Sequence, residues 1–156
     1  MEKKFCDETN YPKIALVMTL VFMFILCYSL YVNYDNKIFF LLLLSVFIII
    51  IIAAFWIYTT SLIINLSKKG IAYELKSFFT EKNFIPMEDI IQIELVSLDF
   101  TTRFGGWGKR KHKNEIAYIF NNNFFLEIKT LSQVYYFSIS DNKKEECLKF
   151  IKNLNE

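Results

Sequence analysis

Two long stretches without a charged residue constrain this chain more than any other feature. The first runs from Ile14 to Val32 and the second from Ile38 to Leu66. At a rise of about 1.5 Å per residue, a helix over the first stretch is about 28 Å long, close to a bilayer's hydrocarbon core of about 30 Å. The second, about 43 Å long by the same rise, should tilt or emerge at its polar end. The sequence therefore predicts two transmembrane helices, spanning about residues 14–33 and 38–62.

Whether these stretches form helices or strands depends on whether lipid or water surrounds them. Five consecutive isoleucines, Ile48 to Ile52, would favour a strand in water, but only a helix satisfies its own backbone groups in lipid. A cleaved signal peptide is the alternative for the first stretch, because Lys3, Lys4 and Lys13 precede it. That stretch is longer than the usual apolar core of about 7–15 residues, and no small-x-small cleavage site follows it. We therefore expect both stretches to remain as spans.

The connection from Asn33 to Lys37 is short enough for a tight helical hairpin, which places both chain ends on one side of the membrane. Lysines flank the outer ends of the two spans, whereas the connection carries Lys37 alone, and the positive-inside rule then places the ends in the cytoplasm. The expected organisation is a cytoplasmic tail over residues 1–12, a hairpin over 13–66 and a cytoplasmic domain over 67–156 in the inner membrane. The three cysteines form no C-x-x-C pair, which suits a reducing compartment.

The segment after the second span has mostly period-two patterning. Short β-branched or aromatic runs cover residues 71–75, 78–85, 90–98, 116–120, 124–128 and 134–139, with turn-prone residues between them. From Asn142 onward the period becomes helical, with Cys147, Leu148, Ile151 and Leu154 on one side. The sequence predicts six or seven strands, joined mainly as hairpins into a small, mainly-β barrel or split barrel, with Leu148 and Ile151 of a C-terminal helix packed into it.

Three motifs in this segment resemble a known family. They are the run Ile85 to Ile91 (IPMEDII), the run Phe104 to Gly108 (FGGWG), and the strand start at Ala117-Tyr118. Together with the closing helix they resemble the bacterial pleckstrin-homology-like (PH-like) domains of small membrane-anchored proteins, over roughly Gly70 to Asn155. In that group a pair of N-terminal spans before the domain is common. The resemblance implies a PH-like split barrel at the inner face of the membrane.

The FGGWG motif has a structural and a chemical interpretation. Gly105, Gly106 and Gly108 permit positive φ, as a sharp bulge or a strand crossing at a barrel corner requires. Trp107 would then be an anchor against the barrel or at the membrane interface, with Phe104 completing the motif. A phosphate-binding loop is the alternative, but the motif lacks the G-x-x-x-x-G-K-[ST] spacing. We therefore interpret it as structural.

A run of basic residues overlaps this motif. Residues 100–114 contain no acidic residue but do contain Arg103, Lys109, Arg110, Lys111 and Lys113. One interpretation is a solvated loop tip, and another is an uncompensated patch attracted to the anionic inner leaflet, at about 1 kcal/mol per basic residue. Nucleic acid is a third partner for such runs. The predicted tether and the net charge of +2 argue against it.

Catalysis finds little support in the residues. His112 is the only histidine and has no evident Ser or Cys partner, so we expect no catalytic residue, no metal site and no cofactor. The sequence thus predicts a non-catalytic, membrane-anchored PH-like module. Its expected partners are anionic membrane lipids, a protein partner or a second copy of the chain, and not nucleic acid. The alternative is a small membrane-active, transport-accessory or toxin-immunity protein whose hairpin is functional and whose domain is regulatory.

Overall fold

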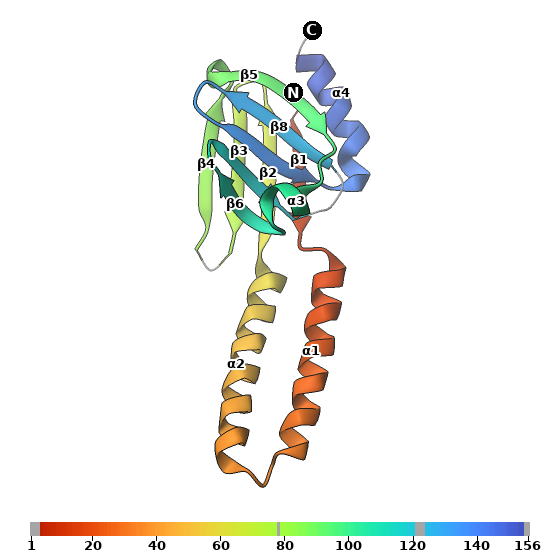
Figure 1. The fold of residues 1–156 in the computed structure, drawn as a ribbon. Helices are drawn as coiled ribbons and strands as arrows, with labels where there is room; N and C mark the ends of the chain where they lie inside the picture. Colours follow the sequence, from red (N-terminus) through yellow and green to blue (C-terminus); the bar gives the residue numbers. More distant parts are fainter. Residues whose placement is uncertain (1–3, 78, 121–123, 155–156) are drawn as a thin grey trace. The chain divides into compact units, whose positions relative to one another are not determined.

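The structure is a computed structural model that describes residues 4–77, 79–120 and 124–154, and this described chain divides into two compact units. One unit is a helical hairpin, Pro12–Thr60, and the other is a β domain. The domain is built from the chain on both sides of the hairpin, up to Tyr11 and from Ser61 onward. Figure 1 shows the elements in chain order.

The hairpin consists of α1 (Lys13–Val32) and α2 (Lys37–Thr59), which pack along each other. At the start of α2, the Asn36 side chain accepts a hydrogen bond from the Phe39 N–H at 3.2 Å, which caps the helix after a very short connection. Both helices are long and apolar enough to cross a membrane. No other helix of the described residues is. The prediction of two long apolar helices joined by a tight connection is thus confirmed.

The predicted end of the second span is wrong. α2 ends at Thr59, and the chain continues as strand β2 (Ser61–Ser67), although the sequence remains uncharged up to Leu66. Leu62, Ile64 and Leu66 are fully buried on one face of that strand. Thr60, whose hydroxyl donates to the Trp56 carbonyl at 2.7 Å, marks the change of structure. The period-two burial of three aliphatic residues in a β core explains why the helix does not continue.

The predicted N-terminal tail over residues 1–12 is also corrected. Residues Phe5–Asn10 form strand β1, which pairs antiparallel with β2 in a register that sets Phe5 opposite Leu66. Its inward residues are Phe5, Asp7 and Thr9, all buried. Asp7 accepts a hydrogen bond from the Ser140 backbone N–H at 2.7 Å, so its buried carboxylate has a partner. The β domain therefore includes β1 and β2 and does not begin at residue 67.

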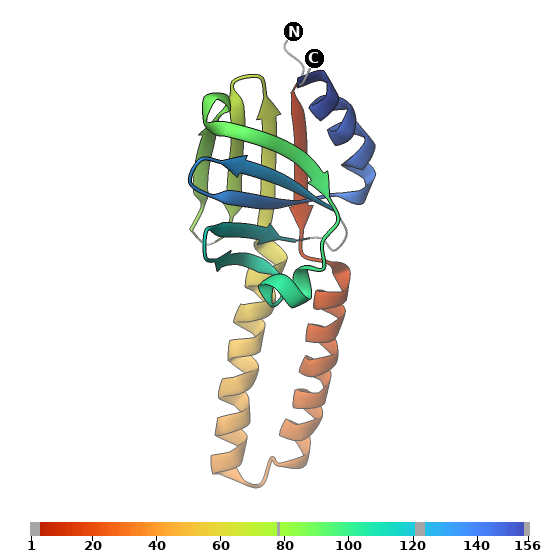
Figure 2. The same ribbon diagram turned by 45° about the horizontal axis from the view of Figure 1, so that its top comes forward.

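Within the described residues the strands form two sheets. Sheet A has the order β1-β2-β3-β4, all antiparallel, with β3 (Gly70–Lys76) and β4 (Glu81–Pro86) following β2 as successive neighbours. A 3-10 turn, η1 (Met87–Asp89), then leads to sheet B, whose order is β5-β8-β9-β7-β6. The strands of the two sheets cross steeply (Figure 2). The bounds in sheet B are β5 Ile90–Val96, β6 Gly108–His112, β7 Glu115–Ile119, β8 Phe124–Thr130 and β9 Val134–Ile139.

One strand pair departs from the expected hairpin arrangement. β7 pairs with β9 in parallel, whereas β8, which lies between them in the sequence, pairs antiparallel with β9 and β5. Parallel neighbours need a crossover connection, and β8 is that connection. The coarser prediction, a mainly-β region with a C-terminal helix, is confirmed.

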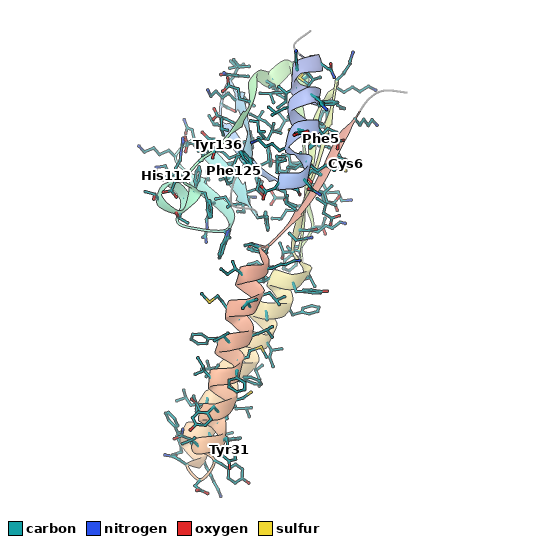
Figure 3. All side chains as sticks on the ribbon, turned by 90° about the vertical axis from the view of Figure 1, so that its right-hand side faces the viewer. Phe5, Cys6, Tyr31, His112, Phe125 and Tyr136 are labelled. Carbon is teal, nitrogen blue, oxygen red and sulfur yellow. The ribbon has the colours of Figure 1, made fainter. Side chains whose placement is uncertain are left out.

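The main core lies between the two sheets. Sheet A contributes Phe5, Leu62 and Ile64 among others, and sheet B contributes Tyr118, Leu126 and Phe137. After η2 (Asp141–Lys143), helix α4 (Lys144–Leu154) adds Cys147 and Ile151 to this core. Phe5 lies on β1 beside α4 (Figure 3), and its ring centroid is 6.4 Å from that of Phe150.

The expectation that Leu148 packs into the core is wrong. Its side chain is 45% exposed, whereas Cys147 and Ile151 are buried. The buried stripe of α4 is therefore rotated slightly from the predicted one, and Leu148 stands at its rim.

Candidate functional site

The FGGWG motif begins at the last residue of a short helix that covers the outer face of sheet B. Asp99 begins this helix, α3 (Phe100–Phe104), by accepting hydrogen bonds from the backbone N–H groups of Thr101 and Thr102. Gly105 ends it with φ of 75°, the left-handed conformation that favours glycine at a helix end. The glycines thus follow a helix end and lead into an edge strand. The predicted corner between two strands is replaced by this helix end.

Trp107 and Phe104 take part in a second, smaller core. They pack against a cluster of Phe100, Ala117, Ile119, Phe125 and Tyr136 on the face of sheet B opposite the main core. Figure 3 shows Phe125 and Tyr136 within the domain. The centroids of the Phe100 and Trp107 rings are 6.4 Å apart. The motif therefore places two aromatic side chains as a cover over sheet B.

The basic run forms strand β6 and the turn after it, where a loop was expected. Lys109, Arg110 and Lys111 lie within β6, and Lys113 lies in the turn with φ of 52°. Facing residues on paired strands share a side of the sheet. Lys109 is opposite Tyr118 on the main-core side, and Arg110 is opposite Ala117 on the α3 side. The cations therefore alternate between the two faces of an edge strand.

Two of the five predicted basic residues have acidic partners, which corrects the expectation of an uncompensated patch. The Arg103 guanidinium pairs with the Glu115 carboxylate, and its Nη2 also donates to the Tyr136 hydroxyl at 3.1 Å. The hydrogen bond with Glu115 raises the pKa of Arg103 above its ordinary value. Arg103 also lies over the Tyr136 ring, 5.1 Å from its centroid. Its contacts are thus mainly within the domain.

Lys109 forms the second of these pairs. Its Nζ lies 2.6 Å from the Glu81 carboxylate at the start of β4, and 5.5 Å from the centroid of the Tyr118 ring. The hydrogen bond from Lys109 lowers the pKa of Glu81. Arg110, Lys111 and Lys113 are exposed, and no carboxylate of the described residues forms an ion pair with them. Three cations without an acidic partner in the described chain therefore remain on the β6 edge.

His112 also lies on this edge, opposite Glu115 in the register and exposed to solvent (Figure 3). Within the described chain, no group of three His, Cys, Asp or Glu side chains is close enough to hold a metal ion. The chemistry of the β6 edge is that of a cationic surface.

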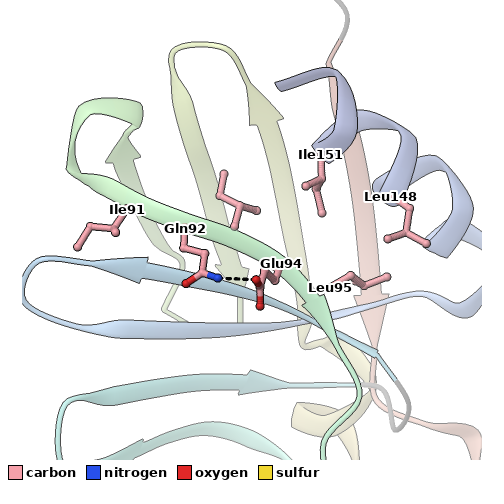
Figure 4. Close-up of a pocket in the computed structure, with 7 residues that line it drawn as sticks. Ile91, Gln92, Glu94, Leu95, Leu148 and Ile151 are labelled. Atoms are coloured by element: carbon pink, nitrogen blue, oxygen red, sulfur yellow. Dashed lines mark hydrogen bonds between the residues drawn. The ribbon is translucent and has the colours of Figure 1, made fainter. Parts of the chain in front are cut away.

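The other edge of sheet B carries a groove that the sequence did not reveal. It lies between β5 and α4, has a volume of about 560 Å³, and is lined by residues 91–95 together with Leu148 and Ile151 (Figure 4). Pockets that bind ligands commonly have volumes of about 300–1,000 Å³. Exposed Ile91 and half-exposed Leu148 form its apolar rim, while Ile151 lies deeper.

The β5 side of the groove is an exposed strand edge. Among the described strands β5 pairs with β8 alone, and the pairing shifts register between Ile90 and Gln92, so Ile91 has no register partner. The Gln92 amide donates to the Glu94 carboxylate along this strand (Figure 4). The exposure of the apolar Ile91 is the feature that indicates the groove. That exposure follows from the register shift of β5, which the sequence alone does not show. The groove therefore combines unpaired strand backbone, apolar side chains and a carboxylate.

Comparison of the chain with protein-family models, with curated protein sequences and with solved structures finds no match. The two edges of sheet B are therefore the surfaces of the described chain that point to a function.

Proposed function

We propose that this chain is a non-catalytic binding module of PH-like type, anchored in the cytoplasmic membrane by α1 and α2. In this proposal the β domain binds an extended segment of a protein partner in the β5–α4 groove. The groove between an open strand edge and the helix is the observation that carries the proposal.

The anchor is supported by the composition of the hairpin and by its place in the fold. α1 and α2 are uncharged between Ile14 and Val32 and between Ile38 and Thr59. Both helices join neighbouring strands of one domain, β1 and β2, so an inserted hairpin would leave that domain on a single side. The lysine distribution favours the cytoplasmic side.

The groove favours an extended peptide over a compact small molecule. An edge strand offers a row of backbone donors and acceptors that a peptide can match by adding a strand, while pockets for alternate side chains supply specificity. Leu148 and Ile91 would contact an apolar side chain of such a segment. Glu94 on the rim favours a basic or hydrogen-bond-donating residue close to it. The partner segment is therefore expected to be extended, with an apolar residue near a basic one.

A comparison of two adjacent positions on α4 tests this proposal. Leu148 lines the groove, whereas Lys149 is exposed and does not. Full-length wild-type, Leu148→Glu and Lys149→Glu proteins, each tagged, are expressed in their native host and captured from solubilised membranes, and co-captured proteins are quantified by mass spectrometry. A specific partner should be retained by wild type and Lys149→Glu and lost from Leu148→Glu, while circular dichroism of all three proteins stays the same.

Two results would change the proposal. Equal capture of every co-purifying protein by all three chains would argue against the groove as the binding site. Recovery of a differently tagged copy of the same chain, lost in Leu148→Glu, would identify the partner segment as part of a homo-oligomer.

A further inference from the structure

One end of sheet A is covalently close to the hairpin. We call it the tether end: it is the end where Asn10 of β1 pairs with Ser61 of β2. Only Tyr11 and Pro12 separate β1 from α1, and only Thr60 separates α2 from β2. Two extended residues span at most about 7 Å. If the hairpin crosses a bilayer, the tether end of the domain is therefore held next to the lipid headgroups.

An exposed aromatic residue lies in a loop at the tether end. Lys76 pairs with Ser61, and Glu81 pairs with Leu75, so the turn that joins β3 to β4 is at this end of the sheet. Within that turn Phe79 is 89% exposed. The Ser77 hydroxyl accepts from the Phe79 N–H at 3.3 Å and donates to the Phe79 carbonyl at 3.0 Å.

The cationic edge strand lies at the same end. In both views β6 is the strand of sheet B nearest the end of sheet A at which β1 ends and β2 begins (Figures 1 and 2). Two contacts within the domain, and one electrostatic effect, agree with this placement. Lys109 pairs with Glu81, a Cβ at Gly108 would lie 3.2 Å from the Tyr11 hydroxyl, and the charge of Arg110 opposes the rise that burial causes in the pKa of Tyr11. The exposed cations Arg110, Lys111 and Lys113 therefore belong to the tether end.

We infer that the tether end is a bilayer-docking surface, in which Phe79 enters the lipid interface and the β6 cations contact anionic headgroups. Aromatic side chains concentrate at the membrane–water interface, and juxtamembrane cations are attracted to anionic lipid. Neither β6 nor Phe79 lines the β5–α4 groove, and β5 and β6 are opposite edges of sheet B. This inference rests on the proposed membrane anchor, and it is independent of the proposed protein partner.

A matched pair of spin-label positions tests the inference in the full-length chain. Phe79 and Leu131 are almost equally exposed, at 89% and 87%. Leu131 lines a hollow with Pro86, which is at the opposite end of β4 from Glu81. Phe79→Cys and Leu131→Cys are each introduced with Cys6→Ser and Cys27→Ser, leaving the fully buried Cys147 unlabelled. A third sample carries Cys6→Ser and keeps the exposed native Cys27 in α1 as a reference.

The labelled proteins are reconstituted into vesicles of phosphatidylcholine with phosphatidylserine, and collision of each label with oxygen and with a water-soluble nickel chelate is measured by power-saturation electron paramagnetic resonance. The label at Phe79→Cys should collide more with oxygen than with the chelate, and the Cys27 label should behave in the same way. The label at Leu131→Cys should collide more with the chelate. Adding Arg110→Ser, Lys111→Ser and Lys113→Ser should increase chelate access at Phe79→Cys several-fold. High salt should reduce that difference between the two proteins.

The reference separates two ways of failing. Chelate access at Phe79→Cys equal to that at Leu131→Cys, with the Cys27 label still in lipid, would overturn the docking surface and leave the anchor intact. A Cys27 label that is as accessible to the chelate as the one at Leu131→Cys would overturn the anchor and the docking surface together. If chelate access at Phe79→Cys is low and changes with neither salt nor the triple substitution, the role of the cations is overturned.

Discussion

Asn10 and Ser61 are register partners at the adjoining ends of β1 and β2, although both long helices lie between them in the sequence. Antiparallel neighbours need only a tight turn, so the hairpin stands where a β-turn would suffice. The β domain is therefore discontinuous in the chain, and it is closed by strands from both sides of the hairpin.

The first prediction is that the hairpin can be replaced by a turn. Exchange of Pro12–Thr60 for Asn-Gly leaves a three-residue connection, Tyr11-Asn-Gly, of a length common in β-hairpins. The product should be a soluble, β-rich domain that unfolds cooperatively on heating, as followed by circular dichroism. The comparison protein is residues 67–156 alone, which lacks the buried Leu62, Ile64 and Leu66 and should not fold. Equal melting of the two proteins would contradict the role of β1 and β2.

The second prediction separates two glycines by what surrounds them. Gly106 has φ of 120°, and no described neighbour lies within 4 Å of an added Cβ, so Gly106→Ala should cost about 1–3 kcal/mol from backbone strain alone. Gly70 has φ of 146°, and an added Cβ would lie 2.2 Å from the Ile85 carbonyl oxygen. Gly70→Ala should therefore cost about 1–3 kcal/mol more, through overpacking. Urea unfolding of the domain in which Asn-Gly replaces Pro12–Thr60 measures the loss of unfolding free energy for each variant. Equal losses would argue against a close approach at Gly70.

The third prediction concerns acid stability. Hydrogen bonds from Thr101 and Thr102 lower the pKa of Asp99 from 3.8 to about 2. Because the folded-state pKa is the lower one, the charged carboxylate stabilises the domain fully above about pH 4, and this contribution is lost as the pH falls toward 2. Asp99→Asn keeps a helix cap without that charge. The difference in melting temperature between wild type and Asp99→Asn should thus shrink between pH 4 and pH 2, and a constant difference would show that the carboxylate is not stabilised in this way.

The fourth prediction uses two neighbours on α4. Ile151 is 8% exposed and part of the main core, so Ile151→Ala should lower the free energy of unfolding by about 2–5 kcal/mol. Leu148 is 45% exposed at the groove rim, so Leu148→Ala should cost less than about 1.5 kcal/mol. Chemical denaturation of both variants gives the comparison. The reverse ranking would mean that Leu148, and not Ile151, belongs to the core.

The two long apolar helices were predictable from their uncharged, strongly apolar sequence, whereas the strands beside them were not. β2 continues the uncharged run, and its alternation is hidden because Ile63, between buried Leu62 and Ile64, is itself apolar. β1 was hidden for the opposite reason: its inward Asp7 and Thr9 are polar, and their partners at Ser140 and Ser138 lie near the other end of the chain. Local patterning does not report such distant contacts.

The candidate sites show the same limit. The basic composition of β6 was visible in the sequence, but the pairing of Arg103 with Glu115 and of Lys109 with Glu81 depends on strand order. The β5–α4 groove depends on where the helix crosses a sheet edge, and a slight rotation of α4 decides whether Leu148 is core or rim.

The buried polar residues of β1 have a consequence for biosynthesis. The ribosome makes β1 before the hairpin and its partner β2 after it, at roughly 5–20 residues per second, so β1 emerges seconds before it can pair. An unpaired apolar strand is an aggregation hazard during such a delay. Asp7 and Thr9 on its inward face make the unpaired segment less apolar, and the Asp7 carboxylate can accept from the Ser140 N–H only after the last strand has been made.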